Sequence, residues 1–301
     1  MTDWSGTFGA RTTADEVVAD LDLSDQLIIV TGANSGIGFE AARTLTSAGA
    51  RVIFACRDSA TGAAAVERTL AEHPGTRAEV STLDLASRQS IEDFTGRIDA
   101  ESIDTVVCNA GLFGGPYQQV HGGIERTVGV GHVGHFLLVR ALLPKLLAQG
   151  GGRVVMVSSE SHRTPSKLDF DRLPLTAEQY SGFTAYGQAK LCNLLFASEL
   201  QRRYGAEGLT ACSLHPGSMV PTNIARNSRM ASLLMLLIRP LTKSPSAGAA
   251  TSVFCATHPH IGEIAGRYFS DCRPKQASIE AQDPEVAGRL WDRTEEWLGR
   301  D

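Results

Sequence analysis

The feature that most constrains this chain is a glycine-rich turn placed directly after a short apolar run. Residues 27–31 are rich in β-branched side chains and predict a buried parallel strand, and Phe39 opens a helix-favouring segment. Between them stand Gly32, Gly36 and Gly38, in the spacing G-x-x-x-G-x-G. Such glycines let a backbone approach a phosphate closely, and the helix N-terminus adds N–H donors and a positive dipole. The pattern predicts a pyrophosphate-binding turn; a tight turn that binds nothing is the alternative.

Composition is that of an ordinary globular protein. The 301 residues are 43% hydrophobic and 20% charged, which suffices for the core of one α/β domain. The formal net charge of −5, with no block of Lys or Arg, argues against nucleic acid as a partner. The six cysteines form no C-x-x-C pair and lie mostly in apolar runs, which is typical of reduced proteins of the cytoplasm.

No targeting or membrane segment is evident in the sequence. The first residues lack the basic and apolar regions of a signal peptide. The longest strongly apolar run, 230–238, is about half as long as a bilayer span needs to be. We therefore expect a cytoplasmic protein without a membrane span.

Short apolar runs alternate with helical segments along most of the chain, which predicts a parallel sheet covered on both faces. We expect one α/β domain over 26–301, a Rossmann-like doubly wound parallel sheet of about seven strands with helices on both faces, preceded by an appendage at 1–25. The candidate strands lie near 27–31, 51–55, 78–83, 103–108, 153–157, 209–214 and 266–269.

The strongest chemical signal is a tyrosine and a lysine four residues apart in the helical segment 183–204. Tyr186 and Lys190 fall on one helix face, where the fixed cation favours the phenolate and lowers the pKa of the tyrosine. A phenol tuned in this way is a general acid or base. Upstream, Ser159 closes a strand and can polarise a carbonyl near the phenol. Taken alone, each of these features also occurs by chance on ordinary surfaces.

The end of the second strand bears on the choice of cofactor. Arg57 stands about 20 residues past the glycines, where an acidic side chain would bind the adenosine ribose and a guanidinium suits a 2′-phosphate. We therefore expect NADP(H) rather than NAD(H). The alternative is that Arg57 is a solvated loop charge and Asp58 is the ribose ligand.

Further polar and small residues follow the other strands, at the edge where ligands bind in such sheets. Asp84 is placed to contact the adenine amine, and 109–111 is a small-residue run that lets the chain pass under a cofactor. Pro216 and Gly217 form a rigid turn after the strand near 209–214. Each is also plain turn chemistry.

Together these motifs resemble the short-chain dehydrogenase/reductase family, in the right order and over about residues 25–270. The segments 55–57 and 134–136 are similar to its retinol-dehydrogenase-like branch. The resemblance implies that Tyr186 is the proton donor and acceptor, that Lys190 lowers its pKa and binds the nicotinamide ribose, and that Ser159 hydrogen-bonds the substrate oxygen. The implied cofactor contacts are Gly32, Asn34, Ser35, Gly36, Ile37, Gly38, Arg57, Asp84, Leu85, Asn109, Ala110, Gly111, Tyr186, Lys190, Pro216 and Gly217.

One position departs from the family pattern. Gly131 stands where the family usually has an asparagine that completes a Ser–Tyr–Lys–Asn tetrad. In the family, the main-chain carbonyl of that residue holds a water that relays protons to the lysine, and the helix kinks there. Glycine keeps the carbonyl and tolerates a kink. Two hypotheses follow: a working enzyme, or an NADP(H)-binding protein with impaired turnover.

The remaining expectations concern ligands and partners. The Met- and Leu-rich run 230–238 lies where the family places its substrate lid, 218–245; a plain core or interface helix is the alternative. As a lid, the run implies a lipophilic carbonyl or alcohol substrate of retinoid-, steroid- or terpenoid-like character. We expect no metal site, and we expect 160–162 to anchor the loop after Ser159. The family often forms homodimers through the helices that carry Gly131 and Lys190, although the insert 161–181 can obstruct that contact.

Overall fold

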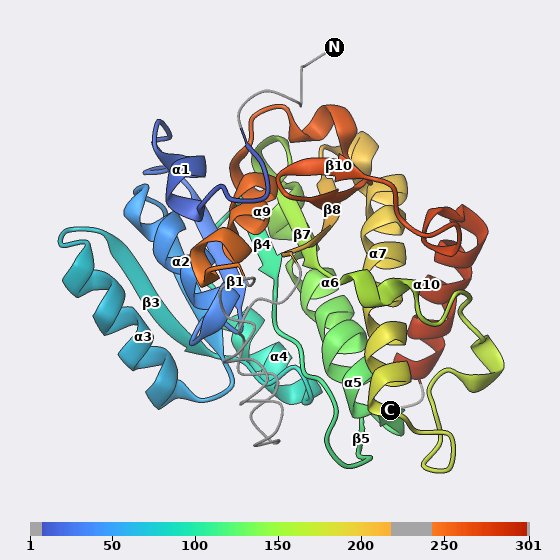
Figure 1. Cartoon of the computed structure of the whole chain (residues 1–301). Helices are drawn as coiled ribbons and strands as arrows, with labels where there is room; N and C mark the ends of the chain where they lie inside the picture. The colour runs from blue at the N-terminus through green and yellow to red at the C-terminus, as the bar shows by residue number, and fades with distance from the viewer. Residues whose placement is uncertain (1–7, 218–242, 300–301) are drawn as a thin grey trace.

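The computed structural model describes residues 8–217 and 243–299, which form a central sheet with helices on both faces (Figure 1). The sheet has eight strands in the order β10-β9-β8-β7-β4-β1-β2-β3. Their bounds are β1 Leu27–Thr31, β2 Arg51–Cys56, β3 Arg77–Thr82, β4 Thr105–Cys108, β7 Arg153–Val157, β8 Thr210–His215, β9 Tyr268–Ser270 and β10 Arg273–Lys275.

The predicted Rossmann-like sheet is confirmed, with one addition. All seven expected strands are present and run parallel to their neighbours. The eighth, β10, pairs antiparallel with β9 at the edge of the sheet. The two residues that turn the chain between them, Asp271 and Cys272, have φ of 55° and 58°. This left-handed turn lies outside the glycine and asparagine patterns that predict hairpins, so no local pattern predicts β10.

Helices cover both faces because the central strands are apolar on both sides. In β1, for example, Ile28 and Val30 pack into one buried cluster, while Leu27 and Ile29 pack into the other. The first cluster takes side chains from α1 Ala14–Val18, α2 Gly36–Ser47, α3 Ser59–Glu72 and α9 Pro245–Thr257. The second takes side chains from α4 Arg88–Gly96, α6 Gly134–Leu147, α7 Gly182–Tyr204 and α10 Pro284–Leu298.

The helical stretch before α6 is not one regular helix. A hairpin of two short strands, β5 Gln119–Val120 and β6 Ile124–Glu125, comes first. The helical stretch then begins with α5 Arg126–Val128 and continues as the π-helical turn η1 Gly129–Val133. As a whole, Arg126–Gly150 is long and apolar enough to cross a membrane, yet 61% of its most apolar window is buried inside the domain. Core helices of globular proteins have the same property.

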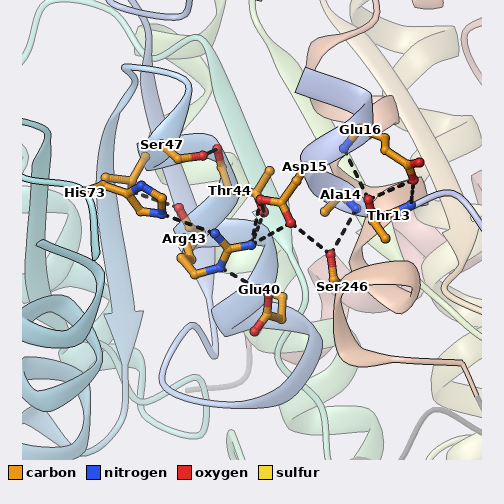
Figure 2. Close-up of polar contacts among 12 residues, drawn as sticks. Thr13, Ala14, Asp15, Glu16, Glu40, Arg43, Thr44, Ser47, His73 and Ser246 are labelled. Carbon is orange, nitrogen blue, oxygen red and sulfur yellow. Dashed lines mark hydrogen bonds and ion pairs between the residues drawn. The ribbon is translucent and has the colours of Figure 1, made fainter. Parts of the chain in front are cut away.

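The N-terminal segment is held against two helices of the domain by hydrogen bonds and an ion pair (Figure 2). Thr13 and Glu16 form a capping box that starts α1. Asp15 accepts hydrogen bonds of 2.8 and 2.9 Å from the Arg43 guanidinium on α2. The Ser246 hydroxyl on α9 donates to Asp15 at 3.2 Å and accepts from the amide of Ala14. Residues 8–25 therefore pack as part of the folded domain.

We predict that Asp15→Asn lowers the free energy of unfolding by about 1 kcal/mol at pH 7, because one bidentate, half-exposed ion pair is lost. Burial acts to raise the pKa of Asp15, but the hydrogen bonds and charge of Arg43 outweigh it and lower the pKa below its ordinary value of 3.8. The stabilisation is therefore complete above that value and disappears as the pH falls through the folded pKa. Urea unfolding between pH 7 and pH 3 measures this, with the exposed Asp20→Asn as control. An equal deficit at both pH values would mean that Asp15 acts through packing rather than charge.

Candidate active site

The glycine turn between β1 and α2 has the backbone geometry that a phosphate cradle needs. Gly32 and Gly36 have φ of 65° and 59°, a conformation that other residues rarely adopt. A Cβ on Gly38 would run into the Asn109 amide and the Gly32 carbonyl. Because α2 begins at Gly36 and is 12 residues long, its N-terminal amides open onto this turn. These residues fit the pyrophosphate of a dinucleotide.

The hydroxyl of Thr31 fixes the turn against the end of β4. It accepts hydrogen bonds of 2.9 Å from the backbone amides of both Asn109 and Ala110. The Asn109 side-chain amide donates to the Thr31 carbonyl, also at 2.9 Å. Thr31 itself is fully buried. The predicted cofactor residues Gly32, Asn109 and Ala110 are thereby held side by side at the carboxyl edge of the sheet.

The same hydroxyl reaches a fully buried histidine on α6. The Thr31 Oγ1 lies 2.9 Å from His135 Nε2, and His135 Nδ1 lies 3.1 Å from the carbonyl oxygen of Gly131. A carbonyl only accepts, so the proton sits on Nδ1, and Nε2 accepts from the threonine. Burial lowers the pKa of His135 to about 4, which keeps the ring neutral at pH 7. The sequence pattern 134–136 did not reveal this role of His135.

Gly131 lies within the π-helical turn η1. Such turns interrupt the regular helical hydrogen bonding and are frequent at functional sites. Here the side chain of His135 bonds the Gly131 carbonyl. A Cβ at position 131 would lie 3.3 Å from the Cβ of Ala189 on α7, which is tighter than most such contacts. The residue that departs from the family pattern is therefore packed directly against the helix that carries Tyr186 and Lys190.

Ser159, Tyr186 and Lys190 come together where β7 ends against α7. The Ser159 hydroxyl lies close enough to the phenol of Tyr186 to act on the pKa of that phenol. Lys190 is buried, and its ammonium donates to the carbonyl of Val157 at 2.8 Å. The Ser158 hydroxyl donates to the Lys190 carbonyl at 2.7 Å, which locks the strand end to the helix. A Cβ on Gly111 would lie 3.5 Å from the Lys190 ammonium, so the chain after β4 passes beside it.

Close packing of the loop after Ser159 depends on Gly187. A Cβ at this position would overlap the carbonyl of Thr164 and would lie 3.0 Å from the carbonyl of Ser161. The glycine therefore lets loop backbone lie directly on α7, between the turns that carry Tyr186 and Lys190.

The expectation that Lys190 lowers the pKa of Tyr186 is wrong for this structure. Burial raises the pKa of Tyr186, and the nearby Ser159 hydroxyl opposes the rise without cancelling it. The ammonium lies 5.5 Å from the centre of the phenol ring and is directed at the Val157 carbonyl. Burial also lowers the pKa of Lys190, to about 8. Desolvation, which spacing along a helix does not reveal, is the largest cause of both shifts.

The anchoring role expected of 160–162 is confirmed. Glu160 accepts from the Tyr268 hydroxyl at 2.7 Å, from Lys275 at 2.9 Å and from Arg163 at 3.1 Å. Burial raises the pKa of Glu160, but these hydrogen bonds outweigh it and lower the pKa to about 2. His162 is fully buried and bonds the carbonyl of Ser159 at 2.7 Å. The segment after Ser159 is thereby tied to β9 and β10.

At the end of β2 the two candidate cofactor residues differ in what they do. Asp58 caps α3, accepting from the amide of Thr61 at 2.7 Å. Arg57 is exposed beside it. The Asn34 side-chain amide donates to the Thr61 hydroxyl at 3.2 Å, which brings the glycine turn and the start of α3 together. The capping bond commits one oxygen of Asp58 to the protein itself.

The other predicted residues also lie along the carboxyl edge. Asp84 follows β3 and accepts from the amide of Ala86 at 2.9 Å, while the Leu85 carbonyl faces His121 at 2.7 Å. Pro216 and Gly217 directly follow β8. Ser35 precedes α2 and Ile37 is buried in its first turn. Most of the predicted lid, 218–245, falls on 218–242, which lies outside the described residues. The contacts of all these residues with a cofactor stay predictions.

An aromatic contact beside Tyr186 was missed from the sequence. The Phe113 ring lies 5.1 Å from the Tyr186 ring and 5.0 Å from the Phe183 ring, nearly perpendicular to both. Phe183 stands three residues before Tyr186 on α7, and its side chain is 76% exposed. The only sequence signal was that both phenylalanines lie within a few residues of predicted site motifs.

Two other places were considered as sites. Within residues 8–217 and 243–299, no group of three His, Cys, Asp or Glu side chains could hold a metal ion. A cavity of about 610 Å³ lies between α7 and the β9–β10 hairpin, and Leu194, Ser198 and Lys275 are among its lining residues. It contains none of the predicted site residues. The chemistry is concentrated at the carboxyl edge of the sheet.

Known proteins resemble this chain over nearly its whole length. WW domain-containing oxidoreductase from Homo sapiens is 42% identical over 94% of this chain and 70% of the relative. Retinol dehydrogenase 12 from Mus musculus is 40% identical over 93% of this chain and 88% of the relative. A crystal structure of an uncharacterised protein from Mycobacterium paratuberculosis is 32% identical, with a TM-score of 0.74 over 94% of this chain and 97% of that one.

A sequence model described as short chain dehydrogenase matches residues 26–169, which hold the glycine turn, the end of β4 and Ser159. The full-length relatives extend the similarity through Tyr186 and Lys190 to the C-terminal helix. The chain is an oxidoreductase that belongs to the short-chain dehydrogenase/reductase family, in its retinol-dehydrogenase-like branch.

Proposed function

We propose that this protein is an NADP(H)-dependent oxidoreductase that interconverts a ketone or aldehyde and the corresponding alcohol on a lipophilic substrate. The observation that carries the proposal is the meeting of Ser159 and Tyr186 beside buried Lys190. The two side chains lie on the same sheet edge as the glycine turn. A hydroxyl and a phenol that lie close together can both contact one substrate oxygen.

The roles of the residues follow from their chemistry. A bound nicotinamide supplies or accepts the hydride at the substrate carbon. Ser159 orients the substrate oxygen by a hydrogen bond, and Tyr186 gives its phenolic proton to that oxygen in reduction or takes it back in oxidation. Lys190, held by the Val157 carbonyl, places positive charge behind the phenol. In reduction, the carbonyl gains a hydride at carbon and a proton at oxygen and becomes the alcohol.

The protonation state of Tyr186 suits proton donation. Burial raises the pKa of the phenol above its ordinary value of 10, so the group carries its proton at neutral pH. A protonated phenol is ready to donate, whereas oxidation requires the phenolate, which burial disfavours.

The phosphorylated cofactor is supported by the end of β2. Asp58 is engaged as the cap of α3, so it is less available to a ribose than a free carboxylate would be. The exposed guanidinium of Arg57 stands next to it, where a 2′-phosphate can form charge-assisted hydrogen bonds.

The proposed lipophilic substrate rests on the Met- and Leu-rich run 230–238 in the sequence, and on the similarity to a protein named retinol dehydrogenase. We further propose that residues 26–301 form the catalytic domain and that the enzyme works in the cytoplasm, on the reduced state expected of its cysteines.

The second candidate function is an NADP(H)-binding protein with impaired turnover, which only Gly131 favours. Against it, the Gly131 carbonyl is held by the buried ring of His135 without an asparagine side chain at that position. We therefore favour the working enzyme.

Tyr186→Phe should lower kcat for carbonyl reduction by about 10²–10⁴, because the proton donor is removed. The Kd for NADPH should change little, and Tyr204→Phe at the end of the same helix should leave both unchanged. Stopped-flow reduction of an active aldehyde and NADPH fluorescence titration measure the two quantities. A variant that retains full kcat would rule out Tyr186 as the proton donor.

Arg57→Ala should raise the KM for NADPH by about 10- to 100-fold, the cost of a charged hydrogen bond to the 2′-phosphate. The KM for NADH serves as the internal control and should change by less than about twofold. If both constants rise together, Arg57 does not contact the 2′-phosphate.

Gly131→Asn tests the two candidate functions. The added Cβ crowds Ala189, so we place it together with Ala189→Gly, and Ala189→Gly alone is the matched control. The double variant should be no more than about tenfold faster than the control if the backbone relay already works. A wild type that turns over no carbonyl, beside a double variant that does, would establish impaired turnover as the natural state.

A further inference from the structure

We infer that Phe113 and Phe183 form an aromatic rim that selects substrates in which a flat conjugated or aryl group is attached to the carbonyl. This inference rests on the proposed function and concerns the same site. Phe183 and Tyr186 lie on one face of α7, three residues apart, and Phe113 stands between them with near-perpendicular ring contacts at 5.0 and 5.1 Å. The rim therefore extends from the proton donor to the surface.

The loop that carries Phe113 is held in place by several contacts with the start of α7. The loop that carries Phe113 is pinned to the start of α7 by the Tyr180 hydroxyl, which donates to the Gly115 carbonyl at 3.1 Å. The Tyr117 and Tyr180 rings also meet at 5.7 Å. At Gly182 the two backbones approach so closely that a Cβ would lie 3.0 Å from the Cα of Gly114. Phe113 is thus held in place from the loop side and from the helix side.

Exposure and charge indicate what the rim binds. Phe183 and Ile279 are the exposed large hydrophobic side chains among the described residues, and only Phe183 continues a chain of rings that ends at Tyr186. Neither 109–120 nor 179–188 contains a charged residue. A rim of uncharged rings suits a neutral substrate, and aromatic rings gain from perpendicular or offset contact with another π system beyond the area they bury.

A matched pair of aldehydes tests this selection. Benzaldehyde and cyclohexanecarbaldehyde have the same number of carbons but differ in flatness and π electrons. Phe183→Leu keeps an apolar side chain and removes the ring. We expect it to lower the ratio of kcat/KM for benzaldehyde over cyclohexanecarbaldehyde by about three- to tenfold, the value of one aromatic contact, with the change mainly in KM. Phe183→Tyr should restore the ratio, and Ile279→Ala, at the other exposed apolar side chain, should leave it unchanged.

The outcomes separate the rim from the enzyme. If wild type reduces both aldehydes and Phe183→Leu leaves the ratio unchanged, the rim is wrong and the proposed function stands. If Phe183→Leu instead dissociates an oligomer in sedimentation without changing the ratio, Phe183 belongs to a subunit interface and the inference is overturned.

If wild type reduces neither aldehyde with NADPH or NADH, binding tests the rim without turnover. Fluorescence anisotropy of 2-naphthylmethanol should then show a Kd about three- to tenfold weaker for Phe183→Leu than for wild type. Equal binding by the two proteins would refute the rim independently of turnover.

Discussion

The buried hydroxyl of Thr31 is the interaction on which the rest of the site depends. It accepts from two amides after β4 and donates to His135, whose other nitrogen holds the Gly131 carbonyl. One side chain thereby joins the glycine turn, the end of β4 and the π-helical turn before α6. Each partner is buried or nearly so, so a lost bond would leave polar groups without compensation, which costs about 1–3 kcal/mol per group.

Around this centre, burial and charge compete, and burial decides the state of the chemical groups. The phenol of Tyr186 is made harder to ionise, the ammonium of Lys190 is made easier to deprotonate, and His135 is kept neutral. Glu160 is the counter-example, because three donors overcome the cost of its partial burial. The difference is whether a group has partners of opposite charge within hydrogen-bonding distance.

Much of this architecture could be predicted from the sequence, because strands that are apolar on both sides and a glycine turn are local patterns. The seven parallel strands and the meeting of Ser159 with Tyr186 follow from those patterns and from the family resemblance. The pKa of Tyr186 could not be predicted, since it depends on how deeply the ring is covered. The partnership of Thr31 with His135 and the edge-to-face contact of Phe113 with Phe183 join residues that are 104 and 70 positions apart, and nothing in a local pattern identifies such pairs.

Gly187 has a consequence for anyone who would redesign this protein. Because loop backbone fills the space where a side chain would stand, the interval between Tyr186 and Lys190 offers no room for variation on that side. Variants with another residue at position 187 would fold with the loop displaced from α7, or would not fold at all. New substrate preferences would have to be introduced one turn earlier, where the chain after β4 meets the first turn of α7 and Phe183 is exposed. In this scaffold, the helix that performs the chemistry is closed to change at Gly187 and open to it at Phe183.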